Sequence, residues 1–337
     1  MRIMAEEFNI SVIIPVRNAA VSLRRCLKSI LSSDYKSYEI IVVDDHSVDE
    51  SVKIAGDFPC RVIIAGSRTG AAVSRNRGAQ KAVGEILVFI DADVFVEKNT
   101  LGKIARTFMH NPQISAVIGS YARETICKNF FSVYKNLISY YTHQTSSKDA
   151  FLFWSGCGAV RKDAFRQVGG FDESFSKTSV EDIELGYRLV DAGHRIYLNK
   201  KIQVIHHKSY NLLTLVASDL FSRAVPWTKL ILKHKKFTND QDTRINNIIS
   251  VCMSYLMVVQ VAFFIFGIIP LKVFFSAMIL TVPSFFIANA ILFRFIVRKK
   301  GLLFVIGFIP MNYFTNLYSG FGFILGGIDY ISSRMLK

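Results

Sequence analysis

Two kinds of hydrophobic pattern alternate along the first half of the chain. Short apolar runs rich in β-branched residues predict buried strands at 10–16, 39–45, 61–65 and 86–90. Between them, apolar residues spaced three and four apart predict helices over 19–32 and 70–83. Ser47 and Glu50 predict a capping box at the start of a third helix. This alternation of strand and helix favours an α/β domain with a mostly parallel sheet.

The pattern changes from about Ile248 onward, where long uncharged runs replace the mixed pattern. Residues 249–269 and 273–293 are uncharged runs of 21 residues each, long enough for a helix to cross a hydrocarbon core of about 30 Å. Residues 301–327 are also uncharged but contain Pro310, several glycines and two asparagines. We expect one kinked span there, with a re-entrant pair of half-helices as the alternative, and the asparagines as interhelical contacts.

Charge and composition then refine this picture. The net charge is +15, from 41 basic and 26 acidic residues. Basic clusters at 233–236 and 294–300 flank apolar segments, which favours a membrane surface over nucleic acid, for which no motif occurs. We therefore expect a domain over 1–240 on the cytosolic side, at the cell membrane if the source is a bacterium, and a multi-pass integral membrane domain over 241–337.

The cysteines and the N-terminus also indicate a reducing compartment. Five cysteines occur without C-x-x-C spacing, which argues against both a disulfide framework and a zinc site. No apolar segment precedes the first predicted strand, so no cleavable signal peptide is predicted.

Carboxylates follow two of the predicted strands. The run Gly84–Val96 contains Asp91 and Asp93 directly after its apolar part, and the second strand ends in Asp44 and Asp45. Open α/β sheets bind ligands at the carboxyl ends of their strands, and paired carboxylates suit a hard divalent cation that a diphosphate also holds. A turn that only closes each strand is the alternative. Neither a dinucleotide fingerprint nor a P-loop occurs.

Several motifs resemble one family when they are taken together and in order. They are SVIIPVRN, IIVVDDHSVDES, GAAVSRNRGAQKAVGEILVFIDADV, and GGFDESF followed by VEDIELGYRL. Over about Ile10–His207 the chain resembles the family 2 glycosyltransferases of GT-A fold, a nucleotide-sugar-binding α/β domain. The resemblance implies an inverting transferase that uses a UDP- or GDP-sugar and a divalent cation, Mg²⁺ or Mn²⁺.

The resemblance also implies roles for individual residues. The nucleotide-sugar contacts would be Pro15, Asn18, Asp44 or Asp45 at the base, Arg75 near the diphosphate, and Asp91 at the ribose. Asp93 would hold the metal, with Asp91 and His206 as further candidates and His207 as the alternative histidine.

Asp182 matches the acidic position that acts as general base in the family. A hydroxyl acceptor is a poor nucleophile until a positioned carboxylate takes its proton. Asp182 and Glu181, a further candidate contact of the nucleotide-sugar, fall in the first turn of a predicted helix, so complementation of the helix dipole is the alternative. Glu184 and Arg188 predict an ion pair on the surface of this helix.

Three further segments carry weaker signals. Residues 126–141 and 209–235 are candidate interfacial helices, although the first also fits an ordinary amphipathic core helix. Arg223 and Trp227 resemble part of the Q-x-x-R-W segment of processive relatives and are candidate substrate contacts, but the glutamine is missing, which argues against a polymer-making synthase. Small residues within 151–160 predict a place where a ligand approaches the backbone closely.

The sequence thus predicts a membrane-anchored inverting glycosyltransferase in the synthesis of cell-envelope glycans. Its acceptor would be a hydroxyl of a lipid-linked molecule or of a glycan, and membrane lipids would be partners. One alternative is a polyprenyl-phosphate acceptor, whose oxygen is already anionic and needs a base less. The other is a non-catalytic nucleotide-binding membrane scaffold.

Overall fold

The computed structural model describes residues 8–175, 179–236 and 243–335. The prediction that no cleavable signal peptide is present concerns the N-terminal residues, most of which lie outside these ranges. The chain forms two compact units, Met1–Tyr210 and Asn211–Lys337. This division lies ahead of the boundary expected at 240. The reason is that helices α8, η1 and α9, which follow Tyr210, pack against the last helix of the chain.

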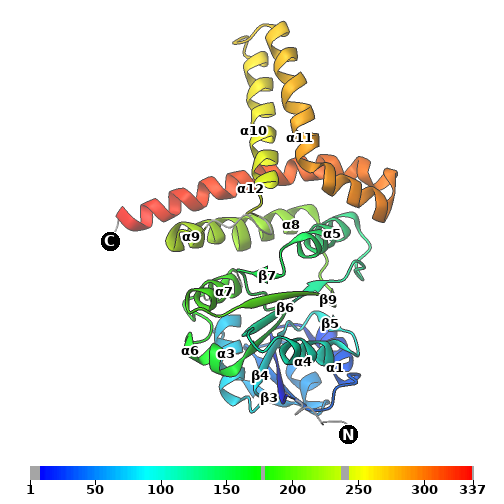
Figure 1. Cartoon of the computed structure of the whole chain (residues 1–337), viewed down its shortest axis with the longest axis vertical. Coiled ribbons are helices and arrows are strands. Elements are labelled where there is room, and N and C mark those ends of the chain that lie inside the picture. The colour runs from blue at the N-terminus through cyan, green and yellow to red at the C-terminus, as the bar shows by residue number, and fades with distance from the viewer. Residues whose placement is uncertain (1–7, 176–178, 237–242, 336–337) are drawn as a thin grey trace. The chain divides into compact units, whose positions relative to one another are not determined.

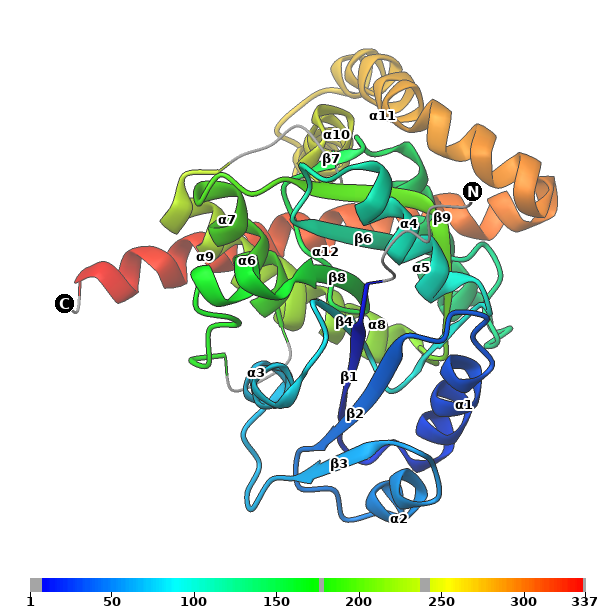
Figure 2. The same cartoon turned by 60° about the horizontal axis from the view of Figure 1, so that its bottom comes forward.

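A nine-stranded mixed sheet forms the centre of the first unit, in the order β3-β2-β1-β4-β8-β6-β9-β5 with β7 beside β9 (Figure 2). The first four strands are parallel, as predicted, and β8 runs antiparallel between β4 and β6. The strands are β1 (Ile10–Val16), β2 (Tyr38–Asp44), β3 (Arg61–Ile64), β4 (Ile86–Ile90), β5 (Val94–Val96), β6 (Ala116–Tyr121), β7 (Asp149–Ala150), β8 (Cys157–Arg161) and β9 (Ile196–His206).

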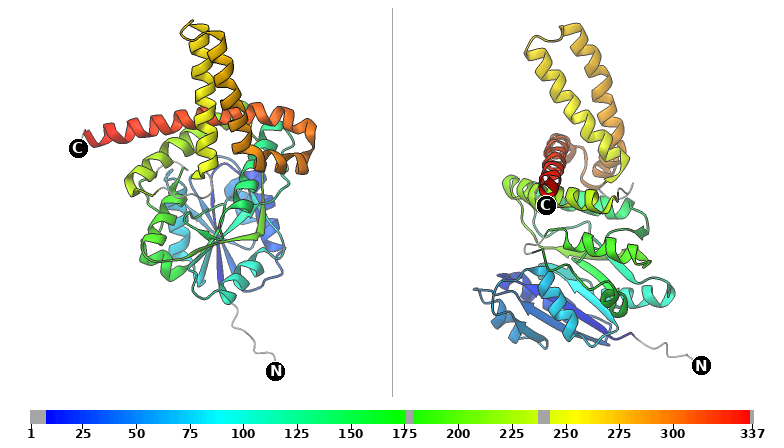
Figure 3. Two further views of the ribbon diagram at one scale, coloured as in Figure 1. Left: turned by 45° about the horizontal axis from the view of Figure 1, so that its top comes forward. Right: turned by 90° about the vertical axis from the view of Figure 1, so that its left-hand side faces the viewer.

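Helices cover both faces of this sheet, as the right-hand view of Figure 3 shows. The first face carries α1 (Ala20–Leu31), α2 (Ser51–Gly56) and α4 (Thr100–His110). The second carries α3 (Ala71–Lys81), α6 (Lys162–Gln167) and α7 (Glu181–Asp191), and α5 (Phe130–Thr145) packs on β6. With both faces covered, every residue of β4 is buried, which explains its uninterrupted apolar sequence.

The pairing of the strands gathers one set of strand ends at a single edge. Ile90 at the end of β4 pairs with Cys157 at the start of β8. Tyr121 at the end of β6 pairs with Val204 near the end of β9. The carboxyl ends of β1, β2, β4, β6 and β9 and the beginning of β8 therefore share one edge of the sheet.

Two local predictions are wrong. The helix expected to begin at Ser47 begins at Ser51, because the Ser47 hydroxyl instead accepts a hydrogen bond from the Asn18 backbone N–H. The pair Glu184–Arg188 does form, but Glu184 is buried. Arg188 also donates to the carbonyl oxygens of Val168 and Gly170. The pair therefore holds the turn at 168–170 against α7 instead of lying on the surface.

The second unit is helical and begins with α8 (Leu212–Asp219), η1 (Leu220–Ala224) and α9 (Val225–His234). It continues with α10 (Ile245–Ile265), α11 (Leu271–Lys300) and α12 (Leu302–Met335), which are labelled in Figure 1. The last three are each long and apolar enough to cross a membrane, which indicates membrane association.

Two features of these helices differ from the prediction or decide between its alternatives. The basic segment 294–300, expected as a loop, continues α11 up to Gly301, whose φ of 82° ends the helix. Residues 302–335 form one helix that contains Pro310, not two half-helices. Of the two asparagines expected as interhelical contacts, Asn316 donates to Ser250 Oγ at 2.6 Å and so joins α12 to α10. Asn289 of α11 donates to the same oxygen at 2.7 Å.

Candidate active site

A carboxylate and an imidazole meet at the ligand-binding edge of the sheet. Asp93 follows β4 and His206 ends β9, and Asp93 Oδ2 lies 3.3 Å from His206 Nε2. Their side chains are 32% and 18% exposed, so a ligand can reach both. Burial raises the pKa of Asp93, but the hydrogen bond with His206 and the charges of His206 and Lys208 outweigh it and hold this pKa below its usual value.

A buried arginine links two distant carboxylates beside this pair. Arg75, in α3, is 2% exposed and donates to Asp91 Oδ1 at 2.8 Å and to Glu181 Oε1 at 2.9 Å. Its guanidinium carbon lies 5.4 Å from the centroid of the Phe171 ring. Burial lowers the pKa of Arg75, and the charges of Asp91 and Glu181 reverse this and raise it, so the guanidinium stays charged. Arg75 thereby fixes the end of β4 relative to the start of α7.

Asp182 projects from the first turn of α7 and is held by the segment that precedes β8. Its Oδ2 accepts hydrogen bonds from the Ser155 backbone N–H and hydroxyl, at 3.1 and 3.2 Å. Burial, together with the charge of Glu181, raises the pKa of Asp182 to about 6, while the Ser155 hydrogen bond and Arg75 oppose the rise. A carboxylate with this pKa is ionised at neutral pH and basic enough to accept a proton.

The acidic groups at the end of β2 lie against backbone N–H groups. Asp45 accepts hydrogen bonds from the backbone N–H groups of Thr69 and Gly70, at the start of α3. Asp44 Oδ2 accepts from the Ser47 backbone N–H. The other oxygen, Asp44 Oδ1, is buried without a partner among the described residues, and such an acceptor is normally satisfied by a ligand or an ordered water.

Pro15 and Asn18 lie at the end of β1 and in the turn that follows it. Pro15 is the next-to-last residue of β1 and pairs with Val43 in β2. Asn18 has a φ of 49°, a left-handed conformation that asparagine tolerates better than most residues. Its Oδ1 accepts from the Val48 backbone N–H at 2.8 Å, so Asn18 ties the turn after β1 to the turn after β2.

The site has two groups that fit a divalent cation. Among the residues that the structure describes, no group of three or more His, Cys, Asp or Glu side chains is arranged to hold a metal ion. Asp91, a further metal candidate, is engaged by Arg75 instead. Asp93 and His206 remain, and one or two protein ligands suffice for Mg²⁺ or a similar cation when a substrate diphosphate supplies the others.

The sequence prediction missed residues that act through distant neighbours. Ser155 holds Asp182 from 27 positions away, so no local pattern points to this contact. Lys208 lies two residues beyond His206, just after the end of β9. Partial desolvation lowers the pKa of Lys208, but Tyr210, Asp93 and Asp91 raise it above its usual value. Tyr121 stacks on His206 with ring centroids 5.1 Å apart and fixes the imidazole plane.

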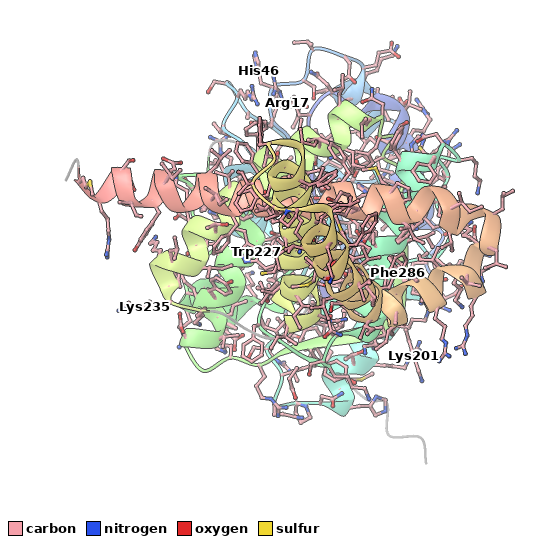
Figure 4. All side chains as sticks on the ribbon, turned by 90° about the horizontal axis from the view of Figure 1, so that it is seen from above. Arg17, His46, Lys201, Trp227, Lys235 and Phe286 are labelled. Carbon is pink, nitrogen blue, oxygen red and sulfur yellow. The ribbon has the colours of Figure 1, made fainter. Side chains whose placement is uncertain are left out.

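Two further predicted groups make contacts within their own part of the structure. Arg223 and Trp227 belong to the helical unit, where Arg223 Cζ lies 5.4 Å from the Trp227 ring; Figure 4 labels Trp227 near the start of α9. Two glycines near the start of β8 make room for aromatic rings. A Cβ on Gly156 would lie 2.7 Å from the Trp154 ring, and one on Gly158 would lie 2.5 Å from the Phe153 ring.

Comparison with known proteins relates part of this chain to a family. Residues 11–169 match the model described as glycosyl transferase family 2. The chain contains a family 2 glycosyltransferase domain. The matched residues include Asp91, Asp93 and Arg75, and they end before Asp182 and His206.

Curated relatives and a solved structure agree with this family 2 domain. The chain is 39% identical over 88 residues to the uncharacterized glycosyltransferase YibD of Escherichia coli (25% of this chain, 26% of YibD). It is 28% identical over 226 residues to the pre-mycofactocin glycosyltransferase of Mycobacterium tuberculosis (63% of this chain, 46% of the relative). The chain therefore spans less than half the length of these two relatives.

The mannosyltransferase PcManGT of Pyrobaculum calidifontis, solved with GDP-Man and Mn²⁺, is similar in fold. It aligns over 97% of this chain and 88% of its own, with a TM-score of 0.57 and 15% sequence identity. The family 2 domain of this chain thus has the GT-A fold, with a mostly parallel sheet flanked by helices.

Proposed function

We propose that this chain is an inverting glycosyltransferase that moves a sugar from a nucleotide-diphosphate sugar to an acceptor at a membrane. The observation that supports this most is the convergence at one sheet edge of a cation-binding pair, Asp93 and His206, and a base, Asp182. Asp91 lies between the cation-binding pair and the base, because its charge raises the pKa of both Asp182 and Lys208. The charge of Asp93 also raises the pKa of Lys208.

The donor would lie along this edge of the sheet. Asp44 and Asp45 at the end of β2 offer acceptors for base N–H groups, and Pro15 and Asn18 border them. Asp91, held by Arg75, would accept a hydrogen bond from the ribose, and Arg75 would act by positioning Asp91 and Glu181, because it is 2% exposed and pairs with both carboxylates. Lys208 adds a positive charge for the diphosphate, where Asp93 and His206 would hold a divalent cation.

The transfer step would use the raised pKa of Asp182. Ser155 holds this carboxylate so that it can take the proton of an acceptor hydroxyl. The acceptor oxygen then forms a bond to the anomeric carbon as the bond from that carbon to the diphosphate oxygen breaks on the opposite face, which inverts the configuration. When bound, the cation would neutralise the charge that develops on the leaving diphosphate.

The helical unit supports a lipid-linked or glycan acceptor at the bilayer. Three helices suited to membrane contact follow the catalytic unit in the same chain. Basic residues at the end of α11 favour a catalytic unit on the cytosolic side, where nucleotide-sugars occur, and at the cell membrane if the source is a bacterium.

A donor panel tests the proposed activity and its metal requirement. We expect the purified full-length chain in detergent to release nucleoside diphosphate from one UDP- or GDP-sugar when extracted lipids are present, and EDTA to abolish the release until excess Mn²⁺ or Mg²⁺ is added. Asp93→Asn should behave like EDTA treatment, whereas Glu97→Gln, an exposed carboxylate nearby, should not. Transfer that persists in EDTA, or no transfer from any donor, would contradict the proposal.

The pH dependence of the rate tests the base. Because Asp182 must be ionised to accept a proton and its pKa is raised to about 6, kcat/KM should rise between about pH 5 and about pH 7 and then level off. The residual rate of Asp182→Asn should lack this rise. A wild-type rate that is flat across this range would exclude Asp182 as the titrating base.

A further inference from the structure

The last helix of the chain crosses the α10–α11 hairpin instead of running alongside it. Tyr255 Oη donates to the Leu317 carbonyl oxygen at 2.6 Å, and Tyr313 Oη donates to that of Ser254 at 3.2 Å. With the bond from Asn316 to Ser250, these contacts join the middle of α12 to the first half of α10. Figure 1 shows α12 running across the end of the hairpin.

The second half of α12 lies beside α8, η1 and α9 in parallel register. Tyr318 Oη donates to Asp219 Oδ2 at 2.9 Å, and Lys229 Nζ lies 2.5 Å from Asp329 Oδ2. Further along, Tyr330 Oη donates to the Leu232 carbonyl oxygen at 3.4 Å. The residue numbers on both sides rise together, so the two helical segments run in the same direction over this length.

Glycines bring the two segments into close contact. A Cβ on Gly322 would lie 2.6 Å from Ala224 Cβ, and one on Gly326 would lie 2.7 Å from the Val225 carbonyl oxygen. A Cβ on Gly327 would meet nothing within 4 Å, so the close face is specific to the other two positions. Small residues that let two backbones approach are typical of helix pairs in a membrane environment.

This helix pair is less apolar than the α10–α11 hairpin but still exposes apolar side chains. The most apolar part of α12 has a mean hydropathy of 1.2, against 2.3 for α10 and 1.9 for α11. The pair includes the charged side chains of Asp219, Lys229 and Asp329, which are costly in hydrocarbon. On α12, Ile324, Ile328 and Ile331 are nevertheless exposed, and their spacing places them on one face of the helix.

We infer that α12 and the α8–η1–α9 segment lie in the surface of the bilayer as a two-helix platform, and that the chain crosses the membrane only twice, through α10 and α11. The headgroup region of the bilayer would cover the exposed isoleucine face, because the platform is continuous with the membrane hairpin. Lys233, Lys299, Lys300 and Arg334 would lie among the acidic phosphates. The end of α12 would then lie on the same side of the membrane as the catalytic unit.

Cysteine labelling decides between two crossings and three. In intact cells that express the full chain, a membrane-impermeant maleimide should label Phe266→Cys, between α10 and α11, and should leave Ser333→Cys in α12 and Val48→Cys in the catalytic unit unlabelled above wild type. After permeabilisation all three introduced cysteines should react with the maleimide. Peptide mass analysis identifies which cysteine carries the label. Labelling of Ser333→Cys in intact cells together with Phe266→Cys would overturn the inference. The readout does not use activity, so it stands apart from the proposed function.

A cross-link tests the helix pair directly in membranes. Ala224→Cys with Gly322→Cys should form a disulfide under mild oxidation, because a Cβ on Gly322 would lie 2.6 Å from Ala224 Cβ and a local separation of about 1 Å gives the Cβ–Cβ distance of a disulfide. Ala224→Cys with Gly327→Cys is the matched control and should not. No cross-link in the first pair, or equal cross-linking in both, would contradict the platform.

Discussion

Replacement of Asp182 by asparagine is expected to lower kcat with a hydroxyl acceptor at least about a hundredfold. The substitution keeps the shape of the side chain and an oxygen that can accept from Ser155, but it removes the group that takes the acceptor proton. The measurement is nucleoside diphosphate release at saturating donor. Asp191→Asn, an exposed position of the same helix, is the control and should retain the wild-type rate.

The outcome also separates the two kinds of acceptor. If the acceptor oxygen belongs to a polyprenyl phosphate, it is already anionic, and Asp182→Asn should keep a substantial part of the wild-type rate. An unchanged rate with an identified hydroxyl acceptor would rule out Asp182 as the base.

The same variant carries a stability signature that reports the raised pKa of Asp182. This pKa is about 6 in the folded chain, above its usual value of 3.8, so the folded state binds the proton more tightly than the unfolded state. The stabilisation from this proton is fully present below about pH 4 and is lost as the pH rises through about 6. Asp182→Asn should therefore raise Tm, relative to wild type, more at about pH 8 than at about pH 4.

Replacement of Arg75 by methionine is expected to lower the free energy of unfolding by about 3–5 kcal/mol, because Glu181 keeps a buried carboxylate without its partner. For a unit of this size, that loss corresponds to a fall in Tm of roughly 6–20 °C, measured by thermal unfolding of the full chain in detergent. Asp91 is 35% exposed and can be solvated, so its contribution to the loss should be smaller.

Two further variants identify the ion pair as the cause of this loss. Arg77→Met removes the same charge from a less buried position of α3 and should cost much less. Arg75→Met combined with Glu181→Met should cost less than the sum of the two single changes, because the unpaired buried charge is gone. Equal losses for Arg75→Met and Arg77→Met would contradict the role given to this pair.

Local patterns predicted the sheet and its ligand-binding edge. The apolar run of β4, followed at once by Asp91 and Asp93, indicated a strand buried on both faces with carboxylates at its end, and the structure has both. The α/β class and the apolar helices were predictable for the same reason, since periodicity and length are local properties.

The links between distant residues were not predictable from the same patterns. Arg75 and Glu181 are 106 positions apart, and only the packing of α3 and α7 on one face of the sheet brings them together. The compact units divide after Tyr210 and not at the expected 240, because the segment 211–234 packs on α12, a contact that no local pattern in that segment indicates. Ser47 matched the capping-box pattern, but its hydroxyl oxygen accepts a hydrogen bond from the Asn18 backbone N–H instead of capping a helix.

The most direct test of the account is a crystal structure of the full chain with Mn²⁺ and the nucleoside diphosphate of its preferred donor, with manganese located by anomalous scattering. We predict a single manganese between Asp93 and the diphosphate, with the carboxylate of Asp182 open to the same cavity. Manganese bound away from Asp93, or Asp93 and Asp182 facing separate cavities, would contradict the account.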